Sequence, residues 1–158
     1  MKKMIVLVAM LTLVLVGCGN KNNGPLFTEE MAVPFGIVNY EEKIAPVLEN
    51  VVPYIAYAKT EGQLASLAAR FKMENVEIDL NEYMALFIVV KTNSCGVSLS
   101  NVFDRDGILS VQLELPESDN CDDEPMPHTF VVKVPKGDYE KVQLYSGVIL
   151  KSTLDIKE

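Results

Sequence analysis

The 158-residue sequence is poor in the residues that most catalytic and metal sites use. It has one histidine, His128, so a Ser-His-Asp arrangement would have to use that residue. It contains neither the GxSxG motif nor the HExxH motif. A lone histidine beside two prolines is more typical of a surface or half-buried position at the start of a strand. We therefore predict no catalytic residue, and the sequence points to no cofactor.

Basic residues are also scarce, with 14 lysines and arginines against 22 acidic residues and a net charge of −8. Binding to nucleic acid or to anionic lipid needs clustered basic side chains. The composition therefore argues against a nucleic-acid partner and against electrostatic adhesion to a membrane.

Long apolar runs are absent except at the N-terminus. Lys2 and Lys3 precede residues 5–16, which are apolar except for Thr12. As a helix this stretch spans about 18 Å, against about 30 Å of bilayer hydrocarbon, so it is too short to be a stable membrane span. A cationic head followed by a short apolar run is typical of an export signal.

The end of that run, Leu15-Val16-Gly17-Cys18, resembles the lipobox of bacterial lipoproteins. The resemblance implies that a peptidase cuts after residue 17 and that Cys18 carries lipid on its thiol and usually on its new amino group. Two or three acyl chains make attachment effectively permanent. Gly19 in place of Asp implies outer-membrane sorting in a host with two membranes, or the outer cell surface in a host with one. Cleavage leaves 12 basic and 22 acidic residues, a net charge of −10.

The other two cysteines, Cys95 and Cys121, form an even pair in a chain predicted to be exported. An oxidising compartment favours a disulfide between them. The bridge would close a loop of about 27 residues and contribute about 3.5 kcal/mol. Two free buried thiols or a metal site are the alternatives, although there is no CxxC motif and no histidine pair.

Local patterns predict one helix among several strands. Thr60-Glu61-Gly62-Gln63 has the form of a capping box, and apolar residues at helical spacing follow as far as Phe71. The run at 54–59 is β-type, residues 76–81 alternate between apolar and polar, and residues 83–90 are continuously apolar, as in a strand buried on both faces. Residues 45–49 could form a short helix with Pro46 at its first position.

The remaining chain alternates strands and turns. Residues 97–103 and 108–115 alternate around a turn at 104–107, which predicts a hairpin. A polar loop at 116–127 carries Cys121, and strands are expected at 129–134 and 139–145. The prolines before residue 53 leave only an edge strand at 35–38.

The loop also holds the one dense group of carboxylates, Asp119, Asp122, Asp123 and Glu124. Calcium takes six to eight oxygen ligands, so these residues are weak candidates for a calcium site. The group lacks the Gly and the bidentate Glu of an EF-hand loop, and four acidic residues on a loop are usually just solvated.

The order of elements over residues 54–145 is similar to that of the C-terminal domain of PrcB-type protease-complex subunits. That family usually has a Thr-Gly-Gly-Tyr-like turn after the apolar strand and a Pro-Tyr before the next-to-last strand. Here the corresponding segments are 92–97, Thr-Asn-Ser-Cys-Gly-Val, and 128–130, His-Thr-Phe. The resemblance implies a noncatalytic β-rich module, an accessory subunit or regulator of envelope proteolysis.

We therefore predict an α+β fold in a single domain, a mainly antiparallel β-sheet with one packed helix. Residues 1–17 are the signal peptide, 18–34 the lipidated cysteine and flexible tether, 35–150 the β-rich domain and 151–158 a tail. The predicted function is noncatalytic protein binding in the cell envelope, with a lipid anchor in the membrane and an envelope protein as partner. The alternatives are an envelope enzyme, with His128 and the acidic loop at one cleft, or a lipoprotein that binds a small ligand.

Overall fold

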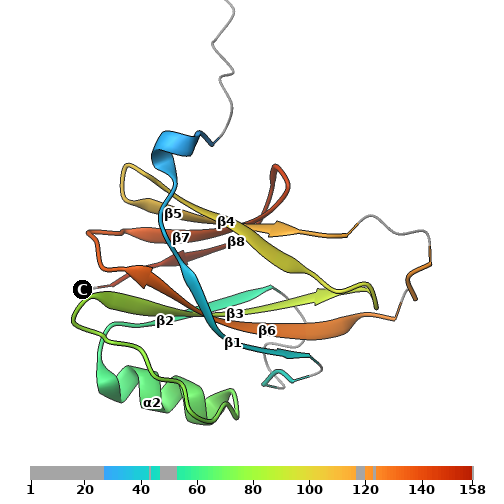
Figure 1. The fold of residues 1–158 in the computed structure, drawn as a ribbon, viewed down its shortest axis with the longest axis horizontal. Helices are drawn as coiled ribbons and strands as arrows, with labels where there is room; N and C mark the ends of the chain where they lie inside the picture. The colour runs from blue at the N-terminus through green and yellow to red at the C-terminus, as the bar shows by residue number, and fades with distance from the viewer. Residues whose placement is uncertain (1–26, 43, 47–52, 117–119, 123, 158) are drawn as a thin grey trace, which may run out of the picture.

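The computed structural model describes residues 27–42, 44–46, 53–116, 120–122 and 124–157. Its elements, in chain order, are η1 (Glu29–Met31), β1 (Gly36–Glu42), β2 (Tyr54–Ala58), α2 (Glu61–Arg70), β3 (Tyr83–Thr92), β4 (Ser98–Arg105), β5 (Ile108–Glu114), β6 (Met126–Pro135), β7 (Lys141–Ser146) and β8 (Ile149–Asp155). The strands form two four-stranded sheets, with orders β1-β6-β3-β2 and β4-β5-β7-β8. The sheets pack face to face, and α2 covers the outer face of the first (Figure 1).

The predicted class, mainly antiparallel strands with one packed helix, is confirmed, but the strands form two sheets instead of one. All neighbouring strands are antiparallel except β5 and β7, which are parallel. This parallel pair arises because β6, which lies between β5 and β7 in sequence, belongs to the other sheet. The pattern of apolar residues in a strand indicates which face is buried. It does not indicate that the chain passes to the other sheet between β5 and β7.

β3 lies at the centre of the first sheet and is buried on both faces, as its apolar run predicts. Leu86 and Ile88 belong to the core between the two sheets, whereas Phe87 and Val89 belong to the second core, beneath α2. Two neighbouring layers of side chains therefore depend on this one strand.

The helix α2 begins as the capping motif predicts. The Thr60 hydroxyl accepts a hydrogen bond from the Gln63 backbone N–H at 3.4 Å, and the Gln63 side chain accepts one from the Lys59 N–H at 2.8 Å. Phe71 ends the helix and packs on Phe87 with ring centroids 5.2 Å apart. These contacts hold α2 on the sheet.

The alternation at residues 76–81 does not make a strand. The Asp79 carboxylate accepts a hydrogen bond from the Asn81 backbone N–H at 2.9 Å, which closes a turn before β3. Ile78 and Leu80 are nevertheless buried in the core beneath α2. The pattern therefore reflects burial of an irregular segment and not pairing with another strand.

The predicted hairpin is confirmed as β4 and β5, which pair in antiparallel register. Asp106 and Gly107 both have positive φ, 54° and 80°, as a tight hairpin turn between twisted strands requires. The Asp104 carboxylate accepts the Gly107 N–H at 3.0 Å and so fixes this turn.

The C-terminal boundary of the fold differs from the predicted tail at 151–158. Residues 149–155 form β8, which pairs with β7. The Tyr57 hydroxyl donates to the Lys157 carbonyl and accepts from the Lys157 N–H, both at 3.0 Å. The prediction missed β8 because its first residues are exposed and lack a buried face.

The predicted tether at 18–34 also contributes to the fold from residue 27 onward. The Val33 N–H donates to the Val102 carbonyl at 2.8 Å, and Phe27 stacks on Phe103 with ring centroids 4.9 Å apart. The chain then continues from the β4 edge into β1 of the other sheet. The predicted signal peptide, Cys18 and most of the predicted helix at 45–49 lie outside the described residues.

Candidate functional site

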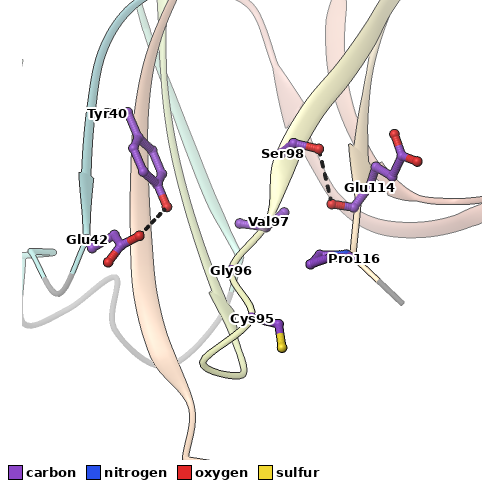
Figure 2. A pocket seen from close by; sticks show the side chains of 8 residues that line it. All are labelled: Tyr40, Glu42, Cys95, Gly96, Val97, Ser98, Glu114 and Pro116. Atoms are coloured by element: carbon purple, nitrogen blue, oxygen red, sulfur yellow. Dashed lines mark hydrogen bonds between the residues drawn. The ribbon is translucent and has the colours of Figure 1, made fainter. Parts of the chain in front are cut away.

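A groove of about 450 Å³ opens between the two sheets where β1 faces the ends of β4 and β5 (Figure 2). It is lined by Tyr40, Glu42, Cys95, Gly96, Val97, Ser98, Glu114 and Pro116. Its walls come from the edge strand β1 on one side and from the second sheet on the other, with the β3–β4 turn between them (Figure 2). Cavities of this volume are typical of binding sites.

At the groove wall, Tyr40 connects a carboxylate to the only histidine of the chain. The phenolic oxygen of Tyr40 lies 2.7 Å from Nδ1 of His128, and the hydroxyl donates to Oε1 of Glu42 at 3.3 Å. A phenol donates one hydrogen bond and accepts others. Both contacts are therefore satisfied together when the Nδ1–H of His128 donates to Tyr40 and Tyr40 donates to Glu42.

His128 is fully buried, which corrects the expectation of a surface or half-buried position. The side chain lies inside because alternation along β6 places it on the same face as Phe130 and Val132 of the inter-sheet core. Its second nitrogen, Nε2, is buried and has no hydrogen-bond partner within the described residues. Burial lowers the pKa of His128, opposed by the charge of Glu42 and by the Asn93 backbone. The imidazole is therefore neutral at pH 7.

Tyr40 is held in its protonated form. Burial raises the pKa of Tyr40 to about 12, and the charge of Glu42 and its hydrogen bond act in the same direction. Tyr40 therefore stays a neutral hydrogen-bond donor at physiological pH. A neutral phenol and a neutral imidazole are suited to fixing the groove wall, whereas proton transfer near pH 7 needs a group that titrates near that pH.

The turn between the two walls is fixed by the disulfide. Cys95 and Cys121 are bonded with their Cα atoms 5.3 Å apart, which confirms the predicted bridge. Next to it the Asp122 N–H donates to the Ser94 hydroxyl at 2.7 Å. The bridge therefore fastens the β5–β6 loop to the β3–β4 turn that lines the groove.

Gly96 is required in this turn. Its φ is +82°, a conformation that L side chains rarely adopt, and a Cβ there would lie 3.9 Å from Cε1 of His128. Its N–H donates to the Asn93 carbonyl at 3.2 Å. Glycine is therefore favoured here by the positive φ of the turn, while the space beside the imidazole would admit a Cβ.

The described carboxylates of the acidic loop do not line the groove. Asp122 and Glu124 are exposed and do not line it, and Asp119 and Asp123 lie outside the described residues. His128 does not line the groove either. Among the described residues, no three His, Cys, Asp or Glu side chains come together in a way that could hold a metal ion. Folding therefore does not gather His128 and the described carboxylates of this loop around one cleft.

The sequence patterns missed Tyr40 and Glu42. The two residues are separated by two positions, which places both on one face of the extended strand β1. Their role depends on His128, whose partner Tyr40 lies 88 positions away in the chain. The only local sign of this site in the sequence was the presence of Tyr40 and Glu42, two positions apart, on the edge strand β1.

Comparisons with models of protein families, with curated proteins and with solved structures gave no match. No helix among the described residues is both long enough and apolar enough to cross a bilayer.

Proposed function

We propose that this protein is a lipoprotein of the cell envelope, anchored through Cys18, that binds an extended segment of another envelope protein without catalysis. The observation that carries the proposal is the groove between β1 and the second sheet, which combines carboxylates with apolar surface. The anchor rests on the lipobox-like residues 15–18. We place the binding domain on the extracytoplasmic side of the membrane.

The chemistry of the groove defines the segment that it would accept. Glu42 and Glu114 lie on opposite walls, and Val97 and Pro116 contribute apolar surface between and beside them (Figure 2). Two carboxylates favour a ligand with a basic side chain, and the apolar surface favours an adjacent hydrophobic residue. A small ligand would have to satisfy the same groups.

The neighbouring edge of β1 supplies a second recognition element. In the described part of the chain β1 pairs with β6 alone, so its other edge presents backbone N–H and C=O groups. An extended peptide commonly binds such an edge by adding a strand. Tyr40 and Glu42 belong to this strand, so one segment could pair with β1 and place a side chain in the groove.

The resemblance to PrcB-type subunits over residues 54–145 supports the choice of partner. It suggests that the bound segment belongs to a protein of envelope proteolysis, with this chain as an accessory subunit. The neutral states of His128 and Tyr40 support a binding role for the groove.

Site-specific crosslinking in native envelopes tests this proposal. A photoreactive amino acid at Ser98, in the groove, should give a discrete adduct, whereas the same amino acid at Ala65, on the exposed face of α2, should not. Glu42→Lys combined with Glu114→Lys should abolish the Ser98 adduct, and Glu61→Lys on α2 should leave it unchanged. The absence of an adduct from Ser98, or the same adducts from both positions, would contradict the proposal.

A further inference from the structure

The turn between β7 and β8, together with the first two residues of β8, exposes three consecutive apolar side chains. Val148, Ile149 and Leu150 have 78%, 59% and 47% of their surface exposed. The Gly147 N–H donates to the Leu113 carbonyl at 3.4 Å, which places the turn beside the end of β5, where Leu115 is 48% exposed. Four of the six large hydrophobic residues that are exposed in the described chain therefore gather at one end of the second sheet. An uncharged apolar turn of this kind is unusual on a surface that faces only water.

The charges around this turn differ from those of the whole chain. The β7–β8 hairpin carries Lys141, Lys151 and one carboxylate, Asp155, which pairs with Lys141 at 3.7 Å at the end away from the turn. Glu114 of β5 lines a shallow cleft together with Ser146 and Gly147, so one carboxylate also lies near the turn. Within the hairpin the charged residue nearest to the turn is Lys151, so the hairpin itself adds no repulsion from anionic lipid at that end.

The N-terminal segment enters the fold next to this turn. The ring of Phe27 packs edge-on against Tyr145, with centroids 5.2 Å apart, and Tyr145 is the cross-strand partner of Leu150. Figure 1 shows η1 and the β7–β8 turn projecting on the same side of the molecule, away from α2. The described chain therefore begins, at Phe27, close to the apolar turn.

The length of chain between Cys18 and Phe27 limits how far the membrane can lie from the folded domain. Nine residue steps separate Phe27 from Cys18, and a fully extended chain spans at most about 3.3–3.6 Å per residue, or about 30 Å. A lipid on Cys18 would hold the bilayer surface within that distance of Phe27, which contacts the hairpin at Tyr145. Tethering makes the second contact intramolecular, so a weak apolar contact is sufficient to hold the domain at the surface.

We propose that Val148, Ile149 and Leu150 insert into the outer part of the same bilayer that holds the Cys18 lipid. This inference rests on the lipid anchor of the proposed function. The inserted turn makes a second attachment point and sets the orientation of the domain, with α2 on the side away from the membrane. Lys151 lies next to the turn, in position to contact lipid phosphate groups.

The absence of tryptophan from the chain makes the test direct. Val148→Trp introduces a single fluorescent reporter at a site exposed enough to accept it, and Ile37→Trp, 47% exposed on β1 of the other sheet, is the matched control. Both lipidated proteins are reconstituted into vesicles of phosphatidylethanolamine and phosphatidylglycerol, with and without bromine on the acyl chains. We expect a blue-shifted emission and several-fold stronger quenching by brominated lipid for Val148→Trp than for Ile37→Trp.

The outcomes separate the two proposals. If the proteins float with the vesicles but both reporters show the same water-exposed, unquenched emission, the anchor stands and the hairpin inference is wrong. If neither protein floats with the vesicles, the anchor itself is wrong. A blue shift of Val148→Trp that appears without lipid and grows with protein concentration would assign the turn to contact with a second copy, and would also overturn insertion.

Discussion

The phenolic oxygen of Tyr40 on the edge strand β1 lies 2.7 Å from Nδ1 of His128 on β6, and the two rings stack with an interplanar angle of 10°. The two strands are direct neighbours, and His128 pairs in register with Glu42. This contact links the groove wall to the buried core, because Tyr40 lines the groove and His128 is buried behind it.

Removing the Tyr40 hydroxyl should destabilise the fold. Tyr40→Phe leaves Nδ1 of the buried His128 without its partner, and a buried polar atom left unpaired costs about 1–3 kcal/mol. Equilibrium denaturation measures the change in unfolding free energy. The control is Tyr54→Phe, whose hydroxyl accepts an exposed hydrogen bond from Arg70 at 3.3 Å and whose loss should cost under about 0.5 kcal/mol. Equal losses for the two variants would contradict the account of the Tyr40–His128 pair.

His128 should make the stability of the protein depend on pH. Burial holds the pKa of His128 below its usual 6.5, so on acidification the unfolded chain takes up the proton first. The unfolding free energy is unaffected by this group above pH 6.5, decreases as the pH falls below that value, and levels off below the folded pKa. Denaturation between about pH 7 and about pH 5 measures the slope. The slope should be shallower in His128→Gln, and an equal slope would exclude His128 as its source.

Loss of the disulfide should destabilise the domain by about 3.5 kcal/mol, because the bridge closes a loop of about 27 residues. Cys95→Ser measures this loss by denaturation. Thiol titration of the denatured, unreduced lipoprotein should find no free thiol, since Cys18 is expected to carry lipid. Two titratable thiols would show that Cys95 and Cys121 are not bridged in the protein as isolated.

Phe87 should be among the most sensitive positions in the core. Its fully buried ring packs on Phe71 beneath α2, so Phe87→Ala leaves a cavity and should cost about 3–5 kcal/mol. Val148→Ala, at an exposed turn, should change the unfolding free energy of the protein in detergent by under about 0.5 kcal/mol. A small effect of Phe87→Ala would mean that α2 does not depend on this layer of the core.

Local sequence patterns were sufficient to predict the elements that are specified by residues close together in the chain. The capping motif at Thr60 gave the start of α2, the apolar run at 83–90 gave β3, and Gly107 marked the β4–β5 turn. Each of these features depends on residues within a few positions of one another. They are therefore readable without knowing the tertiary structure.

The features that were missed depend on contacts between distant residues. The separation into two sheets follows from how strands are distributed between layers, which the alternation within one strand does not encode. The hydrogen-bond partner of the buried His128 is Tyr40, which lies 88 positions away in the chain. β8 begins with exposed residues, so it offered no buried face to recognise. The groove could not be predicted from local patterns either, because its lining comes from three segments that are far apart in the chain.

The measurement that most directly tests membrane attachment is incorporation of labelled palmitate, together with the mass of the protein isolated from cells. The protein should begin at residue 18, carry acyl groups on Cys18 and appear in the membrane fraction. Cys18→Ala should lose the label, whereas Cys95→Ala should retain it. A full-length, unmodified chain in the cytosol, or unchanged incorporation in Cys18→Ala, would contradict the account.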